Sequence, residues 1–315
     1  MNILVTGANG QLGRELKRII KAKGNGHPDH TTADKNYYIF AGHDDLDITD
    51  EDAVAEYVAK NYINVIINCA AYTNVDKAEN EGFMECLKVN TCGPIFLARA
   101  AKQNGCVLIH ISTDFVYDGK KNIPYIPEDK CRPISQYGKT KLAGEQGIVD
   151  SKCRYLIFRT SWLYSALSKN NFVYKIYDKI AHGTEKLNVV NDEIGNPTNA
   201  RDLADFIYHI IEDNNSENRY LSKTGIYHFC NNGWIDRFVF ARYIERCTKA
   251  DEYNIEYERV FPIKGKENSI RPKYSVLDKN KTEDEFDWGI PDWDLSLEKA
   301  MEEIIENEAK QRRIS

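Results

Sequence analysis

Tyr137 and Lys141 are the residues whose types and spacing point most directly to chemistry. They stand four positions apart in "SQYGKTKLAGE" (135–145), and two residues at i and i+4 on a helix share one face. A tyrosine with its ordinary pKa of about 10 is a poor proton donor at neutral pH, but a nearby ammonium favours the ionised form and lowers that pKa. The pair could therefore deliver a proton to an alkoxide that forms from a substrate carbonyl.

Chance also supplies such pairs, because the chain contains 19 tyrosines. A second pair, Tyr117 and Lys121, spans "YDGKK", where Asp-Gly signals a turn, so those side chains need not share a face. Ser112 and Thr113 in "HISTDFVYDG" favour the first pair, because they end an apolar segment where a parallel sheet would hold a substrate carbonyl. The simpler alternative is that the first pair lies on an ordinary surface helix.

A glycine-rich turn near the N-terminus indicates a nucleotide partner. The segment "NILVTGANGQLGRELKRIIK" (2–21) has the pattern of a strand, a tight turn and an amphipathic helix, with Gly7, Gly10 and Gly13 at G-x-x-G-x-x-G spacing. Such glycines let the backbone approach a pyrophosphate, and the helix N-terminus supplies N–H donors. The first gap is wider than in the usual fingerprint, and such glycines can serve chain reversal alone. Their position after the first strand nevertheless favours dinucleotide binding.

The choice between the two nicotinamide dinucleotides depends on the end of the second strand, which reads "IFAGHDDLDIT". An acidic residue there would contact the ribose of NADH, and an arginine would accommodate the 2′-phosphate of NADPH. No carboxylate follows the strand at once and no arginine stands there; His43 is the nearby candidate. We expect NADPH as the cofactor, with NADH also accepted.

The elements that must position these residues alternate short apolar runs with amphipathic stretches, which is typical of a parallel sheet covered on both faces. The expected strands are 2–6, 37–41, 65–69, 107–112 and 155–160. The expected helices are 11–23, 50–61, 82–104, 137–149, 200–213 and 295–314. The pattern predicts an α/β fold with a doubly wound parallel sheet of the Rossmann type, followed by a smaller mixed α/β substrate-binding domain.

The composition excludes several classes of protein. A net charge of −6 and a pI near 5.7 argue against nucleic-acid binding. No long apolar run and no signal-peptide pattern occur, so we expect no membrane partner and a cytoplasmic location. The eight cysteines form no C-x-x-C pair, which predicts reduced thiols. His27 and His30 fall in a polar segment that we interpret as a solvated loop between the first helix and second strand.

Together these stretches resemble the extended short-chain dehydrogenase/reductase family, and closely its dTDP-4-dehydrorhamnose reductase branch. The resemblance covers most of the chain and is strongest at "AAYTNVDKAE" and "RTSWLY". It implies that Tyr137 is the general acid, Lys141 its activator and ribose contact, and Thr113 the partner of the sugar carbonyl. It further implies cofactor contacts at Gly7, Gly10, Gln11, Leu12, Gly13, Asp47, Ile48, Ala70, Ala71 and Tyr72, and substrate contacts at Val75, Asp114, Phe115 and Trp162. For Trp162 a core aromatic and for Asp114 a turn carboxylate are the structural alternatives.

One departure within this superfamily narrows the expected reaction, and a possible metal site stays open. Related dehydratases usually carry Asp-Glu after the threonine, as acid and base for eliminating water, and here Asp114 is followed by Phe115. A dehydratase is therefore disfavoured. Some relatives bind magnesium through glutamates at a dimer contact, and Glu15 with Glu302 or Glu303 could be placed so; a solvated helix face is the other interpretation.

We expect the chain to reduce the 4-keto group of dTDP-4-dehydro-β-L-rhamnose to dTDP-L-rhamnose, the last step of dTDP-rhamnose biosynthesis, as a monomer or homodimer. One alternative is another nucleotide-sugar reductase or epimerase. The other is a non-catalytic subunit resembling the regulatory subunit of methionine adenosyltransferase. The expected dinucleotide-binding domain comprises residues 1–158, approximately 182–222 and 251–271, and the expected substrate domain comprises approximately 159–181, 223–250 and 272–315.

Overall fold

The computed structural model describes residues 1–23, 36–184, 186–213, 218–248, 260–265 and 270–314. The predicted loop with His27 and His30 lies outside the described residues.

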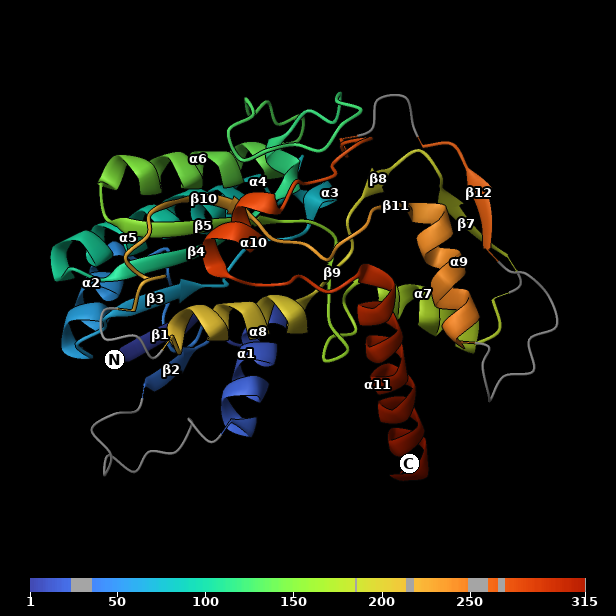
Figure 1. Cartoon of the computed structure of the whole chain (residues 1–315), viewed down its shortest axis with the longest axis horizontal. Helices are drawn as coiled ribbons and strands as arrows, with labels where there is room; N and C mark the ends of the chain where they lie inside the picture. The colour runs from blue at the N-terminus through green and yellow to red at the C-terminus, as the bar shows by residue number, and fades with distance from the viewer. Residues whose placement is uncertain (24–35, 185, 214–217, 249–259, 266–269, 315) are drawn as a thin grey trace.

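A six-stranded parallel sheet forms the larger part of the molecule (Figure 1). Its order is β10-β5-β4-β3-β1-β2. The strands are β1 (Asn2–Thr6), β2 (Tyr37–Ala41), β3 (Val65–Asn68), β4 (Val107–Thr113), β5 (Arg154–Thr160) and β10 (Gly225–His228). The first five confirm the predicted strands, because continuous apolar runs such as "VIIN" need cover on both faces. The order reverses beside β1, so the fold is doubly wound, as predicted.

Helices cover both faces of this sheet (Figure 1). One apolar layer joins the sheet to α1 (Gln11–Ala22), α8 (Ala200–Ile211) and α10 (Asn280–Phe286). The opposite layer joins it to α2 (Glu51–Lys60), α5 (Gly93–Asn104) and α6 (Gln136–Ser151). The helix predicted at 82–104 is α4 (Phe83–Leu87), a π-helical segment (Lys88–Cys92) and α5 in succession. Such π-helical insertions occur often beside functional sites.

The smaller part lies beyond the carboxyl ends of the strands (Figure 1) and has its own apolar core. Its helices are α7 (Phe172–Ala181), α9 (Arg237–Thr248) and α11 (Trp293–Ile314). Its short strands pair as β7 (Leu187–Val190) with β12 (Val260–Ile263), β8 (Ile194–Gly195) with β11 (Ile235–Asp236), and β6 (Leu163–Tyr164) with β9 (Thr198–Asn199). This part supplies the wall that faces the sheet edge.

The positions of five strands and one helix differ from the expected domain limits. β8 and β9 pair within the smaller part, although we expected residues 182–222 in the larger domain. α10 packs on the large sheet, although we expected residues 272–315 in the smaller domain. β10 pairs with β5 in the large sheet, although we expected residues 223–250 in the smaller domain. β7 and β12 pair with each other, and their apolar side chains join the core of α7 and α9, although we expected them in the larger domain. We propose a division that places β10 and α10 with the large sheet, and β7, β8, β9 and β12 with the smaller part.

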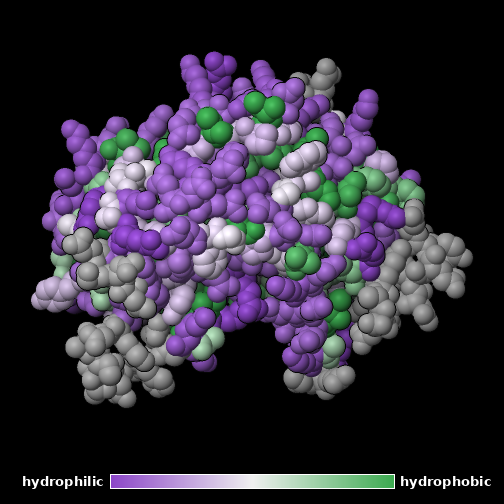
Figure 2. Space-filling model, viewed as in Figure 1, coloured by the Kyte–Doolittle hydropathy of each residue, from purple (hydrophilic) through white to green (hydrophobic). Residues whose placement is uncertain are grey.

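The face in Figure 2 is mostly hydrophilic, with apolar side chains in small patches. Among the helices of the described residues, none has the length and apolar character needed to cross a bilayer.

Candidate active site

The carboxyl end of β4 and the start of α6 bring Thr113 and Tyr137 together. The Ser135 side chain caps α6 by accepting a hydrogen bond from the Gly138 N–H, 3.0 Å away. Gly138 lets the helix approach closely, since a Cβ there would lie 2.2 Å from the carbonyl oxygen of Phe115. The Tyr137 and Thr113 side chains share a hydrogen bond, and the Phe115 ring packs edge-on to Tyr137 with 5.4 Å between centroids. The sequence-predicted acid and carbonyl partner thus meet at one sheet edge.

The surroundings of Tyr137 act on its pKa in opposite directions. Burial of the hydroxyl raises its pKa above the ordinary value, and the negative charge of Asp114 acts in the same direction. The hydrogen bond with Thr113 lowers it. The neighbours in this structure therefore keep Tyr137 in its protonated form, which is the form that donates.

Lys141 is buried, at 2% exposure, one turn along α6 from Tyr137. Its Nζ donates to the carbonyl oxygen of Ile111 at 2.7 Å and lies 3.3 Å from Nε2 of His110. Burial lowers the pKa of Lys141 to about 8, although Glu145 opposes this effect. We expected Lys141 to lower the pKa of Tyr137, but burial is the largest effect on that tyrosine here.

Behind Lys141 lies a buried series of hydrogen-bonded side chains that the sequence alone did not predict. Nδ1 of His110 lies 3.0 Å from Nδ2 of Asn68, and Oδ1 of Asn68 accepts from the Thr6 hydroxyl at 2.8 Å. All three side chains are essentially inaccessible. Their strands are neighbours in the sheet, in the order β4-β3-β1. Polar residues within apolar strands were the available signal, but strand order was needed to connect them.

A cavity of about 730 Å³ lies above the β1–α1 turn. Seven of the predicted cofactor residues line it: Gly7, Gly10, Asp47, Ile48, Ala70, Ala71 and Tyr72. Gly7 has φ +62°, and a Cβ on it would lie 2.5 Å from the Ala70 nitrogen. Asn90, in the π-helical segment, fixes Tyr72 by accepting from its N–H at 2.9 Å and donating to its carbonyl at 3.0 Å. This is a close-backbone cradle of the kind a dinucleotide needs.

Three predicted cofactor residues have other surroundings and are absent from the described lining of this cavity. The Leu12 side chain belongs to the core beneath the sheet. Gly13 lets α1 approach the turn, because a Cβ there would lie 2.5 Å from the Gly7 oxygen. Gln11 accepts a hydrogen bond from Asn171 of the smaller part at 3.1 Å. Their direct contact with a cofactor stays a prediction.

The carboxylates that follow β2 accept hydrogen bonds from nearby residues of the same loop. Asp45 Oδ2 accepts from the Gly42 N–H at 2.8 Å. Asp47 accepts from the backbone and hydroxyl of Thr49, at 2.9 and 2.8 Å, and these bonds lower the pKa of Asp47. His43 is exposed and lines the cavity beside them. The position that follows the strand therefore offers an imidazole.

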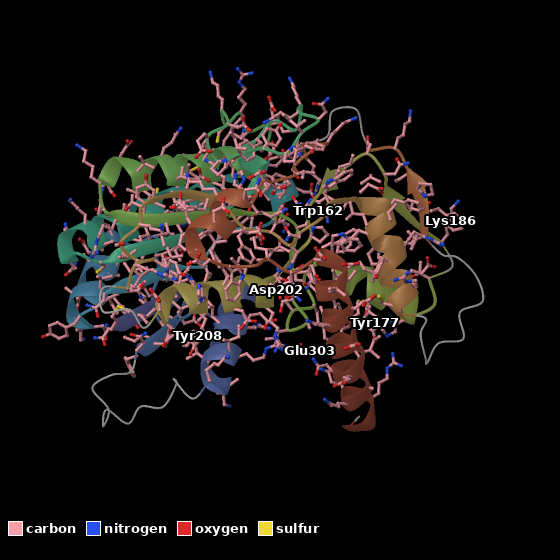
Figure 3. The ribbon with its side chains drawn as sticks, viewed as in Figure 1. Trp162, Tyr177, Lys186, Asp202, Tyr208 and Glu303 are labelled. Carbon is pink, nitrogen blue, oxygen red and sulfur yellow. The ribbon has the colours of Figure 1, made fainter. Side chains whose placement is uncertain are left out.

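The predicted substrate residues lie around the junction of the two parts. Asp114 is buried, and its Oδ2 has no hydrogen-bond partner among the described residues. Burial raises the pKa of Asp114 to about 6, although hydrogen bonds from Ser275 and Thr113 act to lower it. Trp162 has φ +44°, a strained conformation for a bulky residue, and Figure 3 shows it between the sheet and the smaller part. Val75 begins α3 (Val75–Ala78), which packs against α6.

The smaller part adds a cation that the sequence analysis missed. The Arg237 guanidinium lies 3.5 Å from the ring centroid of Trp162 and 4.8 Å from that of Phe172. Its Nε lies 3.6 Å from Glu193 Oε2. Burial lowers the pKa of Arg237 to about 10, and Asp114 is one of the carboxylates that opposes this effect. An acidic and a basic group thus face the junction from opposite sides.

The second Tyr-x-x-x-Lys pair does not form a comparable unit. The Tyr117 hydroxyl is 2.8 Å from His228 Nε2 and accepts from Arg159 at 2.6 Å in the interior. Lys121 instead pairs with Asp129 at 2.5 Å. The two side chains have separate partners, which agrees with the turn predicted between them.

The glutamates considered for magnesium have other partners. Glu15 accepts from Ser165 at 2.6 Å and pairs with Arg18, which also pairs with Glu303. Glu302 is exposed. Within the described ranges, no cluster of three or more His, Cys, Asp or Glu side chains could hold a metal ion. These contacts give no support to the magnesium site.

Comparison with known proteins decides the family. The family model described as the RmlD substrate binding domain matches residues 1–306. The dTDP-4-dehydrorhamnose reductase of Salmonella typhimurium is 35% identical over 97% of this chain and 98% of its own length. The chain belongs to the dTDP-4-dehydrorhamnose reductase family. A second member, from Mycolicibacterium smegmatis, is 35% identical over 96% of this chain and 86% of its own.

Solved structures of the reductase family share the fold. A dTDP-4-dehydrorhamnose reductase from Clostridium acetobutylicum has a TM-score of 0.82 at 35% identity, covering 96% of this chain and 99% of that one. The reductase from Bacillus anthracis in complex with NADP also has a TM-score of 0.82, at 32% identity and the same coverage. The predicted fold class and family are confirmed.

Proposed function

We propose that this chain reduces the 4-keto group of dTDP-4-dehydro-β-L-rhamnose to dTDP-L-rhamnose with NADPH. The observation that carries the proposal is the hydrogen bond between Thr113 and Tyr137 at the carboxyl end of β4, with the glycine-lined cavity on the same sheet edge. Family membership supports the substrate class, because the Salmonella relative bears the reductase name. The NADP complex of the Bacillus anthracis relative supports the cofactor.

The chain's own residues supply binding and the proton. Gly7, Gly10 and Ala70 line the cavity and fit a dinucleotide, because the glycines let the backbone pack closely there: a Cβ on Gly7 would lie 2.5 Å from the Ala70 nitrogen and one on Gly10 would lie 3.2 Å from the Gly7 oxygen. When bound, NADPH supplies the hydride. Thr113 donates a hydrogen bond to the sugar carbonyl, and the Tyr137 hydroxyl gives its proton to the oxygen that becomes an alcohol. We propose that Asp114, Phe115 and Trp162 hold the sugar at this position.

The decisive experiment follows NADPH absorbance with the dTDP-4-keto-6-deoxy sugar generated in situ. Tyr137→Phe should lower kcat by roughly 10²- to 10⁴-fold, because the proton donor is removed, while NADPH binding measured by fluorescence is retained. Tyr62→Phe is the matched control, since Tyr62 is 80% exposed, and should keep the parent rate. A Tyr137→Phe enzyme with the parent kcat would show that another group delivers the proton.

The same assay separates the rival functions. A panel of uridine and thymidine sugars distinguishes this reductase from one that acts on another nucleotide sugar. Absence of NADPH oxidation, together with co-purification of a synthetase, would identify the chain as a binding subunit. The oligomeric state and cytoplasmic location stay predictions.

A further inference from the structure

The orientation of the buried Asn68 amide is fixed by the backbone. The Ala70 N–H donates to Asn68 Oδ1 at 3.1 Å, and a backbone N–H has no other role than donor. The Thr6 hydroxyl reaches the same oxygen at 2.8 Å. The other end of the amide, Nδ2, must therefore face Nδ1 of His110, 3.0 Å away. A reversed amide would lose the bond from Ala70.

This orientation decides where His110 carries its proton. Because Asn68 Nδ2 is a donor, His110 Nδ1 must accept, and a neutral imidazole then bears its proton on Nε2. The ring is neutral, since burial holds the pKa of His110 well below the ordinary range and Lys141 acts in the same direction. The Nε2–H consequently points to Lys141 Nζ, 3.3 Å away.

The two charge states of Lys141 respond differently to that N–H. A neutral amine can donate to the Ile111 carbonyl and accept from His110 with its lone pair. An ammonium has three donors and no acceptor, so it meets the Nε2–H donor to donor. We propose that Asn68 and His110 are positioning residues that select the Nε2–H tautomer and thereby make Lys141 a more ready proton donor than an isolated lysine.

The other groups around Lys141 do not supply this effect. Glu145 lies one turn further along α6 and favours the ammonium. Cys86 of α4 acts electrostatically in the same direction. Glu145 and Cys86 thus raise the pKa of Lys141, whereas burial and the His110 N–H act to lower it. The inference rests on the proposed reductase activity for its consequence, but the tautomer itself exists without turnover.

The first experiment measures the tautomer in the parent protein, with ¹⁵N-labelled histidine and long-range ¹⁵N–¹H correlation spectra. His110→Gln assigns the signal by its loss. We expect the Nε2–H tautomer at pH 7. An Nδ1–H tautomer or a protonated ring at pH 7 would overturn the inference, whether or not the protein turns out to be the proposed reductase.

The second experiment replaces the amide donor. In Asn68→Asp the oxygen that faces His110 is an acceptor, so the proton should move to Nδ1 and the freed Nε2 should accept from the Lys141 ammonium. We expect the alkaline limb of the kcat profile to move upward by about one pH unit or more, together with the change of tautomer. If the alkaline limb moved while the proton stayed on Nε2, the charge of the new aspartate alone would explain the shift. That outcome would overturn the inference.

Thr6→Val is the matched control. It removes one bond to Asn68 Oδ1 at a buried position but leaves the Ala70 N–H, which alone fixes the amide. We expect the parent tautomer and an alkaline limb at the parent position. A limb that moves as far in Thr6→Val as in Asn68→Asp would indicate a general packing effect and contradict the proposed selection.

Discussion

The guanidinium of Arg237 lies 3.5 Å from the ring centroid of Trp162, which follows the end of β5 in the chain. The same indole packs against Gly195, where a Cβ would lie 2.8 Å from the Trp162 Cε2. Trp162 is held by these contacts in a left-handed backbone conformation, at φ +44°. Strain of this kind persists where the surrounding structure enforces it, often in binding sites.

Arg237→Lys should weaken sugar-nucleotide binding. A lysine keeps the charge but loses the planar stacking surface, so we expect the KM for the keto sugar to rise about tenfold or more, with little change in NADPH binding. Arg246→Lys is the matched control, because Arg246 stands on the same helix and lies 4.1 Å from the Tyr243 centroid, away from the junction. Equal effects of the two substitutions would exclude a specific role for Arg237.

Asp114 should make stability depend on pH. Burial raises its folded-state pKa to about 6 from the ordinary 3.8, so between these values the folded state binds the proton more tightly. Stability is therefore lost as pH rises through this window. Asp114→Asn should remove this loss and gain roughly 3 kcal/mol at pH 8, measured by urea unfolding across pH. Asp150→Asn, exposed on α6, should keep the parent pH dependence; a parent-like profile for Asp114→Asn would refute the assignment.

Breaking the ion pair between Glu145 and Arg159 should be costly. The two side chains are 2% and 3% exposed and lie 2.7 Å apart. Glu145→Gln leaves a buried guanidinium without its counter-charge, so we expect a loss of about 3–5 kcal/mol in the free energy of unfolding. Glu51→Gln removes an exposed pair with Arg99 of similar length, 2.8 Å, and should cost less than about 1 kcal/mol. Similar losses in both variants would contradict this account.

Gly7→Ala should abolish NADPH binding while the chain stays folded. The Cβ would lie 2.5 Å from the Ala70 nitrogen, in the floor of the cavity. Gly105→Ala is the control for backbone strain alone, because Gly105 has φ +69° but open space around its Cβ position. We expect it to lower the free energy of unfolding by about 1 kcal/mol and to keep the parent affinity for NADPH. Fluorescence titration measures both variants, and undiminished binding by Gly7→Ala would exclude this cradle.

His43 should set the preference for NADPH. In His43→Asp a carboxylate would repel the 2′-phosphate and accept from a free ribose hydroxyl, so we expect the KM ratio of NADPH to NADH to rise roughly tenfold. His182→Asp, with a side chain 62% exposed at the end of α7, should leave the ratio unchanged. An unchanged ratio in His43→Asp would place the 2′-phosphate elsewhere.

The sequence by itself determined the first five strands of the large sheet, the glycine turn and the helix that carries Tyr137 and Lys141. These features are local: an apolar run needs a covered strand, a tight turn needs glycine, and helical spacing fixes a shared face. The short strand at 225–228 was missed because four residues carry little periodicity, and its place beside β5 is a long-range pairing.

Tertiary structure decided what surrounds those residues. His110, Asn68 and Thr6 belong to strands far apart in the chain, and only the order β4-β3-β1 aligns them behind Lys141. Trp162 and Arg237 meet because the smaller part folds back over the sheet edge. Local patterns specify which elements form; burial, tautomer and charge depend on which elements become neighbours, and these neighbours are set by packing of the whole chain.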